Sequence, residues 1–426
     1  MTKRSFIGLI GPRLLCDRIE SDPREPESIP IPQRLILLIH EPLDSTRETL
    51  IKKGDLVKQG EKIILYKEST EYAIAPDSGT ITHIASYSGD FGTVETYLVL
   101  ERDGKDNKAN NFSKAAETPE LATADRFLRR LPGAPPFAQL LDPKLKIETL
   151  VIEGTDSDLS STTRQYLLTT ARDEIERGIA LFRQITGIKN IAITIPLELR
   201  ESLLFNGVRA LLVPPEYPKA LPKIVMNELL GIVPTPGLSC EEQGVLFMGV
   251  EAVISMARAY ALKDPVYDKA VTVIGKDGAQ HRVRAFIGTP IHRIFKQLNI
   301  VCNEGDRIII GGPMKGIAAY TLYHPIQPDT DTIIVQDQSE IPYVSDYPCI
   351  NCGKCVRICP ANVPVNLLVR YLEANLYQEA ADNFDLNSCI ECGMCSYVCT
   401  SRIPVFQYIR LGKHELIELE TEETHA

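Results

Sequence analysis

Toward its C-terminal end the chain reads Cys349-Ile-Asn-Cys352-Gly-Lys-Cys355-Val-Arg-Ile-Cys359, and 40 residues later it reads Cys389-Ile-Glu-Cys392-Gly-Met-Cys395-Ser-Tyr-Val-Cys399. Both stretches space their cysteines as C-x2-C-x2-C-x3-C. Soft thiolates bind iron, and two-residue gaps let three sulfurs surround one face of a cubane cluster. In this pattern the fourth cysteine of each stretch binds the cluster of the other stretch. The spacing therefore predicts two linked [4Fe-4S] clusters.

The crossed pattern assigns four thiolates to each cluster. Cluster 1 is expected to be bound by Cys349, Cys352, Cys355 and Cys399. Cluster 2 is expected to be bound by Cys389, Cys392, Cys395 and Cys359. Zinc is disfavoured, because a structural zinc site more often combines two C-x2-C pairs or adds histidine. The isolated cysteines are expected to be small buried apolar residues rather than ligands: Cys16, Cys240 and Cys302.

Composition excludes several other classes of protein. The chain has 426 residues and 11 cysteines, 8 of which fall between Cys349 and Cys399, so metal ligation is favoured over a disulfide scaffold. The net charge of −10 argues against nucleic-acid binding. No apolar run approaches the roughly 20 residues that span a bilayer, and the first 30 residues lack a signal-peptide pattern. We therefore expect a cytoplasmic protein that is at most peripheral to a membrane.

The segment between the cysteine runs is expected to be helical. Pro364 suits a first turn, and Leu368, Leu372 and Leu376 lie on one face of a helix over Pro364–Phe384. A helical connector of this length favours an α-helical ferredoxin domain. We assign residues 341–426 to this two-cluster domain and a C-terminal tail.

The N-terminal part of the chain has β character. After a proline-rich start, short strands alternate with glycine turns, as at Lys53-Gly54-Asp55 and Asp77-Ser78-Gly79. The spacing resembles the barrel-sandwich hybrid of lipoyl and biotinyl domains. We assign this domain and an N-terminal extension to residues 1–105, and a polar linker to residues 106–120.

The middle of the chain changes character twice. Residues 121–265 alternate strands, such as Leu150–Ile152, with helices, such as Thr163–Ile185. This alternation predicts a three-layer α/β domain with a mostly parallel sheet. Residues 266–340 return to short strands around one helix and look like a β-grasp unit. The fold class is thus multidomain α+β.

The order of these parts resembles the C subunit of the Rnf electron-transport complex. The motifs that support this resemblance most specifically are Gly288-Thr-Pro290, Gly311-Gly-Pro-Met-Lys-Gly316 and the two cysteine runs. The first two lie in the part that is similar to the soluble-ligand-binding β-grasp (SLBB) domain. Residues 121–265 are similar to the flavin- and NADH-binding domain of respiratory complex I and its Rnf relatives. The resemblance implies electron transfer between NADH, FMN and iron–sulfur clusters, coupled to ion transport by membrane subunits.

One motif of that family is eroded. Its flavin/NADH loop reads roughly Gly-x-Gly-Gly-Ala-Gly-Phe-Pro, where this chain has Leu131-Pro-Gly-Ala-Pro-Pro-Phe-Ala138. Three prolines have entered, and each lacks an N–H donor. A second family motif, Asn-Gly-x-Glu-Cys-Glu-Pro, keeps only acidic character here. The candidate residues of this degenerate FMN/NADH site are Gly133, Ala134, Phe137, Asp156 and Asp158. We expect that NADH oxidation and FMN binding are lost.

The sequence therefore predicts an electron-transfer subunit of an Rnf-type, ion-translocating membrane complex, without catalytic residues or an NADH site of its own. Its expected partners are the membrane subunits and a protein electron donor or acceptor, either a ferredoxin or a cytochrome. One alternative is an NADH-linked FMN/iron–sulfur reductase, which needs the missing glycine loop. A biotinyl-type carrier would need a Met-Lys-Met hairpin where the chain has Tyr66-Lys67-Glu68. A third alternative is a β-grasp ligand-binding scaffold with purely structural clusters.

Overall fold

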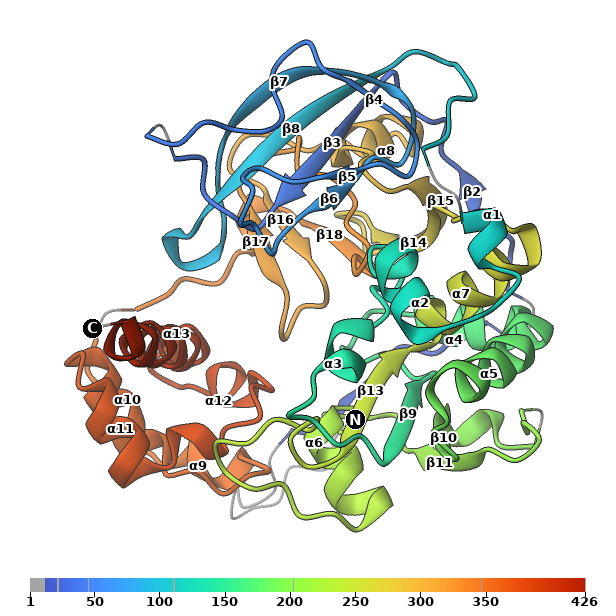
Figure 1. Ribbon diagram of the computed structural model, residues 1–426. Coiled ribbons are helices and arrows are strands. Elements are labelled where there is room, and N and C mark those ends of the chain that lie inside the picture. The colour runs from blue at the N-terminus through green and yellow to red at the C-terminus, as the bar shows by residue number, and fades with distance from the viewer. Residues whose placement is uncertain are drawn as a thin grey trace.

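The structure is a computed structural model that describes residues 12–20, 23–44, 46–109, 112–201, 203–345 and 347–425. Its elements fall into a β unit, an α/β unit, a mixed sheet and a helical unit, which follow one another from blue to red in Figure 1. The first eleven residues of the expected N-terminal extension lie outside this description. In the part of the chain described, no helix is both long and apolar enough to cross a membrane.

The β unit consists of two small sheets packed around one core. Its four-stranded antiparallel sheet has the order β3 (Arg34–Ile39), β8 (Val94–Arg102), β7 (Gly79–Ser88) and β4 (Leu56–Val57). A second sheet pairs β5 (Lys62–Ile63) with β6 (Ala73–Ile74). Alternate apolar residues of β3 and β8 point into the core, where Leu35, Leu98 and Leu100 are fully buried.

The α/β unit has the parallel sheet that the alternation of strands and helices predicts. The order is β11 (Arg209–Val213), β10 (Asn190–Pro196), β9 (Thr149–Glu153) and β13 (Val245–Gly249). Separate apolar clusters cover the two faces of this sheet. The helices are α2 (Leu121–Leu128), α3 (Phe137–Leu141), α4 (Thr163–Thr170), α5 (Arg172–Thr186), α6 (Pro222–Val225) and α7 (Val250–Leu262). Shorter elements are η2 (Leu197–Leu199), β12 (Glu216–Tyr217) and η3 (Met226–Leu230).

The single helix expected over Thr163–Ile185 is wrong, because α4 and α5 are separated at Ala171. The hydroxyls of Thr169 and Thr170 donate to backbone carbonyls within the last turn of α4. Such back-bonding bends and weakens a helix. Helix α5 then begins afresh with two acidic residues, which the positive end of its dipole favours.

A mixed six-stranded sheet adjoins both the β unit and the α/β unit, because Phe286 of this sheet packs against the cores of both. Its order is β17 (Ile317–Ala319), β16 (Arg307–Ile310), β18 (Thr332–Gln336), β14 (Asp268–Ile274), β15 (Gln280–Phe286) and β2 (Glu27–Ser28). Helix α8 (Ile291–Gln297) packs its apolar face on this sheet through Ile291, Ile294 and Phe295. A short turn, η4 (Gln338–Glu340), follows the last strand.

The proline-rich N-terminal segment is an integral part of two sheets, which its sequence does not suggest. Strand β1 (Leu14–Leu15) pairs with β12, and β2 pairs with β15. Proline lacks an N–H donor but is tolerated at sheet edges, and both strands occupy edge positions. The segment therefore connects the α/β unit to the mixed sheet.

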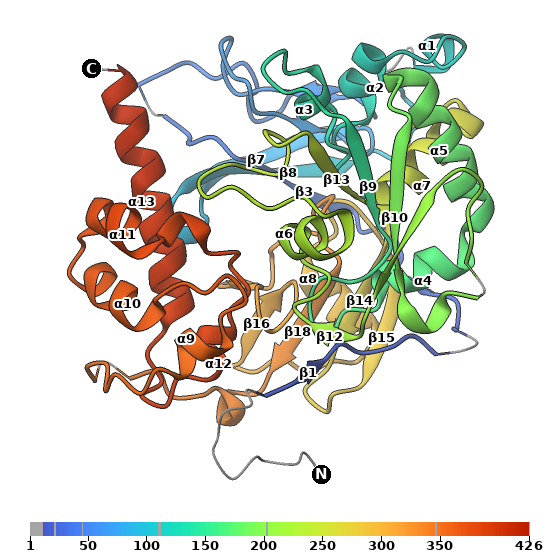
Figure 2. The same cartoon turned by 90° about the horizontal axis from the view of Figure 1, so that it is seen from below.

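The helical unit contains α9 (Lys354–Ile358), α10 (Val365–Glu373), α11 (Tyr377–Phe384), η5 (Leu386–Ser388), α12 (Met394–Tyr397) and α13 (Val405–His425). The single helix expected over Pro364–Phe384 is wrong. Helix α10 ends at a left-handed Asn375 (φ 58°), and the Leu376 N–H donates to the Tyr371 carbonyl at 2.9 Å. This is a Schellman-type stop, which asparagine tolerates in place of glycine. Figure 2 shows α10 and α11 folded back beside α13.

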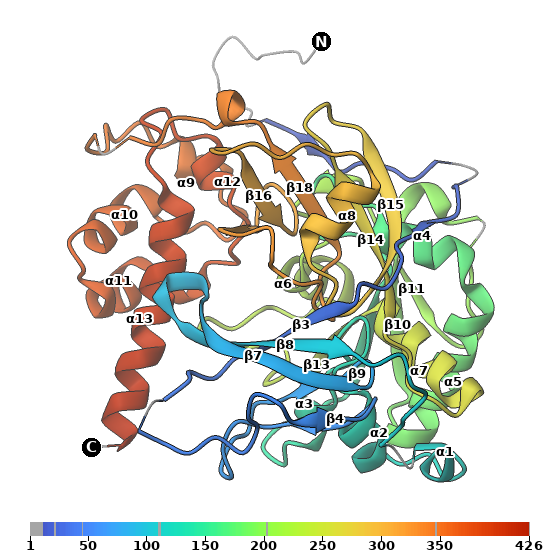
Figure 3. The same ribbon diagram turned by 90° about the horizontal axis from the view of Figure 1, so that it is seen from above.

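Two further contacts show that the units do not pack as independent domains. The stretch 106–120 is more than a linker, because Phe112 in α1 (Phe112–Ala115) is fully buried against Phe127 and Tyr260. The β7–β8 hairpin also reaches the helical unit, as Figure 3 shows. Phe91, in the hairpin turn η1 (Asp90–Gly92), stacks on His414 of α13 with ring centroids 5.3 Å apart. Long-range packing thus joins the first and last units.

Candidate electron-transfer site

The two cysteine runs repeat one backbone conformation. Left-handed residues occupy the third and fifth positions of each run and the third position after it, with φ between 54° and 70°: Asn351, Gly353 and Asn362, then Glu391, Gly393 and Arg402. In each run the glycine immediately precedes a short helix, α9 or α12. Alternation of right- and left-handed residues turns successive N–H groups toward one point, a geometry used at iron–sulfur sites. The Glu391 N–H lies 3.4 Å from the Cys389 sulfur in this way.

The first set of thiols surrounds a small pocket at the edge of the helical unit. The pocket is lined by Cys349, Cys352 and Cys355 of the first run together with Cys399 of the second. Cys352 is exposed, and its sulfur lies 3.9 Å from the Thr400 hydroxyl. The backbone N–H of Lys354 is the main cause that lowers the pKa of Cys352. This set therefore has one face open to solvent.

The second set of thiols is more deeply buried and includes the last cysteine of the first run. Cys392 and Cys395 are buried, and burial raises the pKa of Cys392 to about 11. Cys359 is among the neighbours that raise the pKa of three thiols: Cys389, Cys392 and Cys395. Cys399 thus lines a pocket with three thiols of the first run, and the charge of Cys359 acts on three thiols of the second run.

The donor set suits iron–sulfur clusters. Four thiols converge at each place, and backbone N–H groups act on Cys352, Cys355, Cys389, Cys392 and Cys395 in the direction that favours thiolate. Soft thiolates with N–H donors around the sulfurs are typical of such clusters. Among the described residues, no group of three or more His, Cys, Asp or Glu side chains lies close enough to hold a single metal ion.

The second set is sealed against the rest of the molecule by residues that motif reasoning did not single out. The Tyr217 hydroxyl donates to the Cys392 carbonyl at 2.6 Å. Burial raises the pKa of Tyr217 well above its ordinary value, so the phenol keeps this proton. A Cβ on Gly393 would lie 2.6 Å from the Met314 carbonyl oxygen, so glycine is required for this approach. Cys16 lies in the same apolar cluster and has a raised pKa, chiefly because of burial.

The eroded glycine loop lies beside a cavity of about 230 Å³ between the ends of β9 and β13. Of the candidate residues of the degenerate FMN/NADH site, Gly133 and Ala134 line this cavity. The N–H groups of the loop are already used, however. Gly133 donates to Pro328, Ala134 donates to Leu131, and Phe137 donates to Pro135. A Cβ on Gly133 would also collide with the Ala252 backbone, so the loop covers the N-terminal turn of α7.

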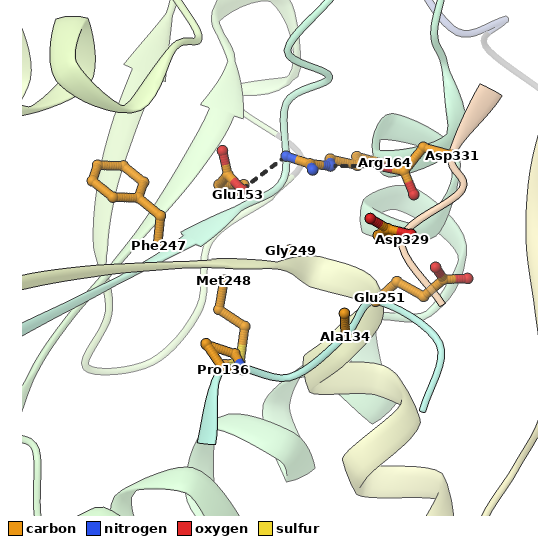
Figure 4. A pocket seen from close by; sticks show the side chains of 11 residues that line it. Ala134, Pro136, Glu153, Arg164, Phe247, Met248, Gly249, Glu251, Asp329 and Asp331 are labelled. Atoms are coloured by element: carbon orange, nitrogen blue, oxygen red, sulfur yellow. Dashed lines mark hydrogen bonds and ion pairs between the residues drawn. The ribbon is translucent and has the colours of Figure 1, made fainter. Parts of the chain in front are cut away.

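The cavity is acidic. Four carboxylates line it, Glu153, Glu251, Asp329 and Asp331, against the single guanidinium of Arg164. Figure 4 shows Arg164 between Glu153 and Asp331, at 2.9 Å and 3.1 Å. Behind them, the fully buried Lys269 lies 2.9 Å from Glu251 and 3.4 Å from Asp331. Arg164 and Lys269 are therefore both paired with carboxylates of the protein itself.

The other candidate residues lie outside the cavity lining. Phe137 is fully buried in the core of the α/β unit. The Asp156 carboxylate accepts from the Ser161 hydroxyl and from the backbone N–H groups of Arg164 and Gln165. The Asp158 carboxylate accepts from backbone N–H groups in the loop after β16, and burial raises its pKa. Both aspartates therefore hold loops together.

The buried Lys315 lies within the electrostatic range of both the cavity and the second cysteine run. Burial lowers the pKa of Lys315, nearby carboxylates oppose this shift, and Arg164 adds to it. These charged groups include Glu153 and Arg164 of the cavity and Glu391 of the second cysteine run.

Two stretches of the chain match known domain families. Residues 14–105 match the model of the RnfC barrel sandwich hybrid domain, and residues 348–403 match that of a 4Fe-4S dicluster domain. The chain is 27% identical over 378 residues to the C subunit of the ion-translocating oxidoreductase complex of Serratia proteamaculans, covering 83% of this chain and 53% of that protein. The resemblance that the motifs indicate is confirmed.

Two further matches differ in how much of the other chain they cover. Identity to the C subunit of the proton-translocating ferredoxin:NAD(+) oxidoreductase complex of Clostridium ljungdahlii is 27%, over 91% of this chain and 89% of that protein. The crystal structure of an NAD+-reducing [NiFe]-hydrogenase in the H2-reduced state shares 14% identity, with a TM-score of 0.44 over 73% of this chain and 63% of the other. That likeness is too weak to bear on function. The chain spans about half the length of the Serratia relative.

Proposed function

Because the chain is a divergent relative of the C subunits of ion-translocating oxidoreductase complexes, we propose that it is the electron-transfer subunit of such a complex. Two [4Fe-4S] clusters would carry the electrons. The observation that carries the proposal is the pocket that Cys399 of the second run lines together with Cys349, Cys352 and Cys355 of the first. Membrane subunits of an Rnf-type complex would be its partners, at the cytoplasmic face of the membrane.

The proposed ligand sets follow the two groups of thiols. Cluster 1 would be held by Cys349, Cys352, Cys355 and Cys399, and cluster 2 by Cys389, Cys392, Cys395 and Cys359. Each cluster, when bound, accepts and releases single electrons. The chain's own residues exclude water from the deeper set through Tyr217 and Met314, and they leave the shallower set open at Cys352. Electrons would therefore enter or leave through cluster 1.

The remaining units would be inherited scaffolds. We propose that residues 266–340, which supply every strand of the mixed sheet except the edge strand β2, form a β-grasp domain of the soluble-ligand-binding type. The α/β unit, within residues 121–265, would be a flavin/NADH domain that has lost its ligand. Its parallel sheet and the position of the Gly133 loop at the strand ends support this relation.

The loss of the NADH site follows from charge and hydrogen bonding. A pyrophosphate needs N–H donors and positive charge, whereas the loop has three prolines and its N–H groups are bonded internally. The cavity adds four carboxylates. Unsatisfied phosphate oxygens would cost several kcal/mol, which corresponds to about a thousandfold in affinity. We therefore place the electron donor or acceptor on another protein, a ferredoxin or a cytochrome.

Metal analysis tests the cluster content. The anaerobically purified chain should hold about eight irons and eight acid-labile sulfides, because each run of four cysteines completes one [4Fe-4S] cluster. Iron and sulfide are measured chemically beside protein concentration. Zinc in place of iron, or about four irons after full reconstitution, would contradict the proposal.

Titration with NADH tests the absence of a nucleotide site. The cluster-replete protein should keep its visible absorbance when NADH is added anaerobically, because the loop cannot receive the pyrophosphate. Dithionite should bleach the same sample, which shows that the clusters can be reduced. Stoichiometric extractable FMN together with rapid bleaching by NADH would instead establish the NADH-linked reductase.

A further inference from the structure

The surface near Cys352 combines exposed apolar side chains with basic ones. Four large apolar side chains lie 53% to 71% exposed just before and within the first cysteine run: Tyr343, Val344, Tyr347 and Ile350. The Ser345 N–H donates to the Arg402 carbonyl at 3.0 Å, so this strap runs beside the end of the second cysteine run. Exposed apolar groups that gather in one place mark interaction sites.

Positive charge flanks the same place. Residues 343–362 and 397–404 carry three basic residues, Lys354, Arg357 and Arg402, and one acidic residue, Asp346. This contrasts with the net charge of −10 for the whole chain and with the four carboxylates of the cavity. Arg357 donates to the Cys352 carbonyl at 3.4 Å and therefore supports the thiol loop. Lys354 and Arg402 are exposed, and their side chains have no hydrogen-bond or ion-pair partner among the described residues.

We propose that this surface, the cluster 1 face, docks a redox protein whose own cofactor is surrounded by acidic residues. The inference rests on the proposed electron-transfer function and names the partner's chemistry. Tyr343, Val344, Tyr347 and Ile350 supply the apolar contact, and Lys354 and Arg402 supply the charge that orients the acidic partner. Complementary charge steers the encounter, and apolar contact slows dissociation. The face surrounds the exposed ligand Cys352, so docking there brings the partner's cofactor to the shallower thiols.

Stopped-flow kinetics with two probes tests the charge. Electron exchange with the cluster-replete full chain is measured for an acidic two-cluster ferredoxin and for a basic cytochrome c, across a range of ionic strength. The ferredoxin should react faster at low salt, and added salt should slow its reaction because exposed charges are screened. Faster exchange with cytochrome c, or a ferredoxin rate that does not depend on salt, would overturn the inference.

Paired variants locate the face. Lys354→Glu with Arg402→Glu should lower the second-order rate constant with ferredoxin about tenfold or more at low salt. The matched control Lys53→Glu with Lys189→Glu reverses two exposed lysines elsewhere, and it should change the rate less than about twofold. Equal losses in both pairs would overturn the proposal. If the glutamate pair loses iron, Lys354→Gln with Arg402→Gln replaces it and should still slow the reaction severalfold.

The apolar part has its own control. Tyr347→Ser with Ile350→Ser should weaken saturable ferredoxin binding about tenfold, whereas Leu56→Ser with Val233→Ser, which are both 76% exposed, should leave it unchanged. No difference between these pairs would contradict the docking face. Dithionite reduction of every variant distinguishes a failure of the proposed function from a failure of the docking face. Clusters that are absent from the unaltered chain would refute the proposed function, while intact clusters with insensitive ferredoxin kinetics would refute only the docking face.

Discussion

Replacing Cys359 by alanine is expected to remove cluster 2, although Cys359 belongs to the first cysteine run. The structure places Cys359 among the groups that act on Cys389, Cys392 and Cys395. The pocket lined by the other thiols of its own run contains Cys399 instead. Loss of one thiolate leaves a cluster with an open iron, so up to about four irons per chain should be lost while cluster 1 keeps all its ligands.

Electron paramagnetic resonance of reduced samples decides this prediction through a set of single variants. The spectrum of Cys359→Ala should match that of Cys392→Ala, and the spectrum of Cys399→Ala should match that of Cys352→Ala. Cys16→Ala is the control, because Cys16 lies in the apolar cluster around Cys392 but outside both runs. It should keep both signals. If Cys359→Ala instead resembles Cys352→Ala, each run binds its own cluster and the crossed assignment is wrong.

Replacing Lys269 by methionine should destabilise the α/β unit by about 3–5 kcal/mol, the usual cost of leaving a buried charge without its partner. The Lys269 ammonium is fully buried, lies 2.9 Å from Glu251 and donates to the Pro328 carbonyl at 2.9 Å. The same carbonyl accepts from Gly133. Methionine would leave the Glu251 carboxylate buried and would release the loop that closes the cavity.

The loss should depend on pH in a definite direction. Burial, opposed by Lys269, raises the pKa of Glu251 to about 7, above its ordinary value. An acid whose pKa is higher in the folded state binds more protons when folded, so its contribution to stability falls as the pH rises between the two values. Without the cation the folded pKa rises further. The penalty in Lys269→Met should therefore be smaller near pH 5 than near pH 8.

Hydrogen exchange of amides in β9 and β13 measures this local stability without requiring two-state unfolding of the whole chain. Lys52→Met is a suitable control, since Lys52 and its partner Glu48 are 59% and 82% exposed. An exposed pair of this kind contributes little to stability, because water screens its charges. A penalty for Lys269→Met no larger than the control, or one that does not change with pH, would contradict the assigned role of the buried lysine.

Local patterns were enough for those features that neighbouring residues decide. The cysteine spacing indicates clusters because only two or three residues separate successive cysteines, so the local backbone decides whether their sulfurs can reach one cluster. The left-handed residues Gly353 and Gly393 lie within the same short runs. Alternation of strands and helices predicts the parallel sheet around β9 for a similar reason. The two helices expected over Thr163–Ile185 and Pro364–Phe384, however, are each divided into two in the structure. Apolar periodicity continues across a break, and the stop at Asn375 depends on one left-handed residue.

Tertiary structure alone decided how these parts meet. No periodicity links Tyr217 to Cys392, 175 residues apart, or Lys269 to Glu251, yet these contacts seal the deeper thiols and close the cavity. Sequence also suggested Asp156 and Asp158 as ligand-facing residues, whereas packing turned both toward backbone N–H groups. Such partners are chosen by which surfaces the folded units bury together, and a buried polar group must find its partner wherever the chain brings one. The spacing of cysteines along the sequence indicates which groups can bind a cluster. Burial and charge pairing, in contrast, depend on segments that meet only in the folded molecule.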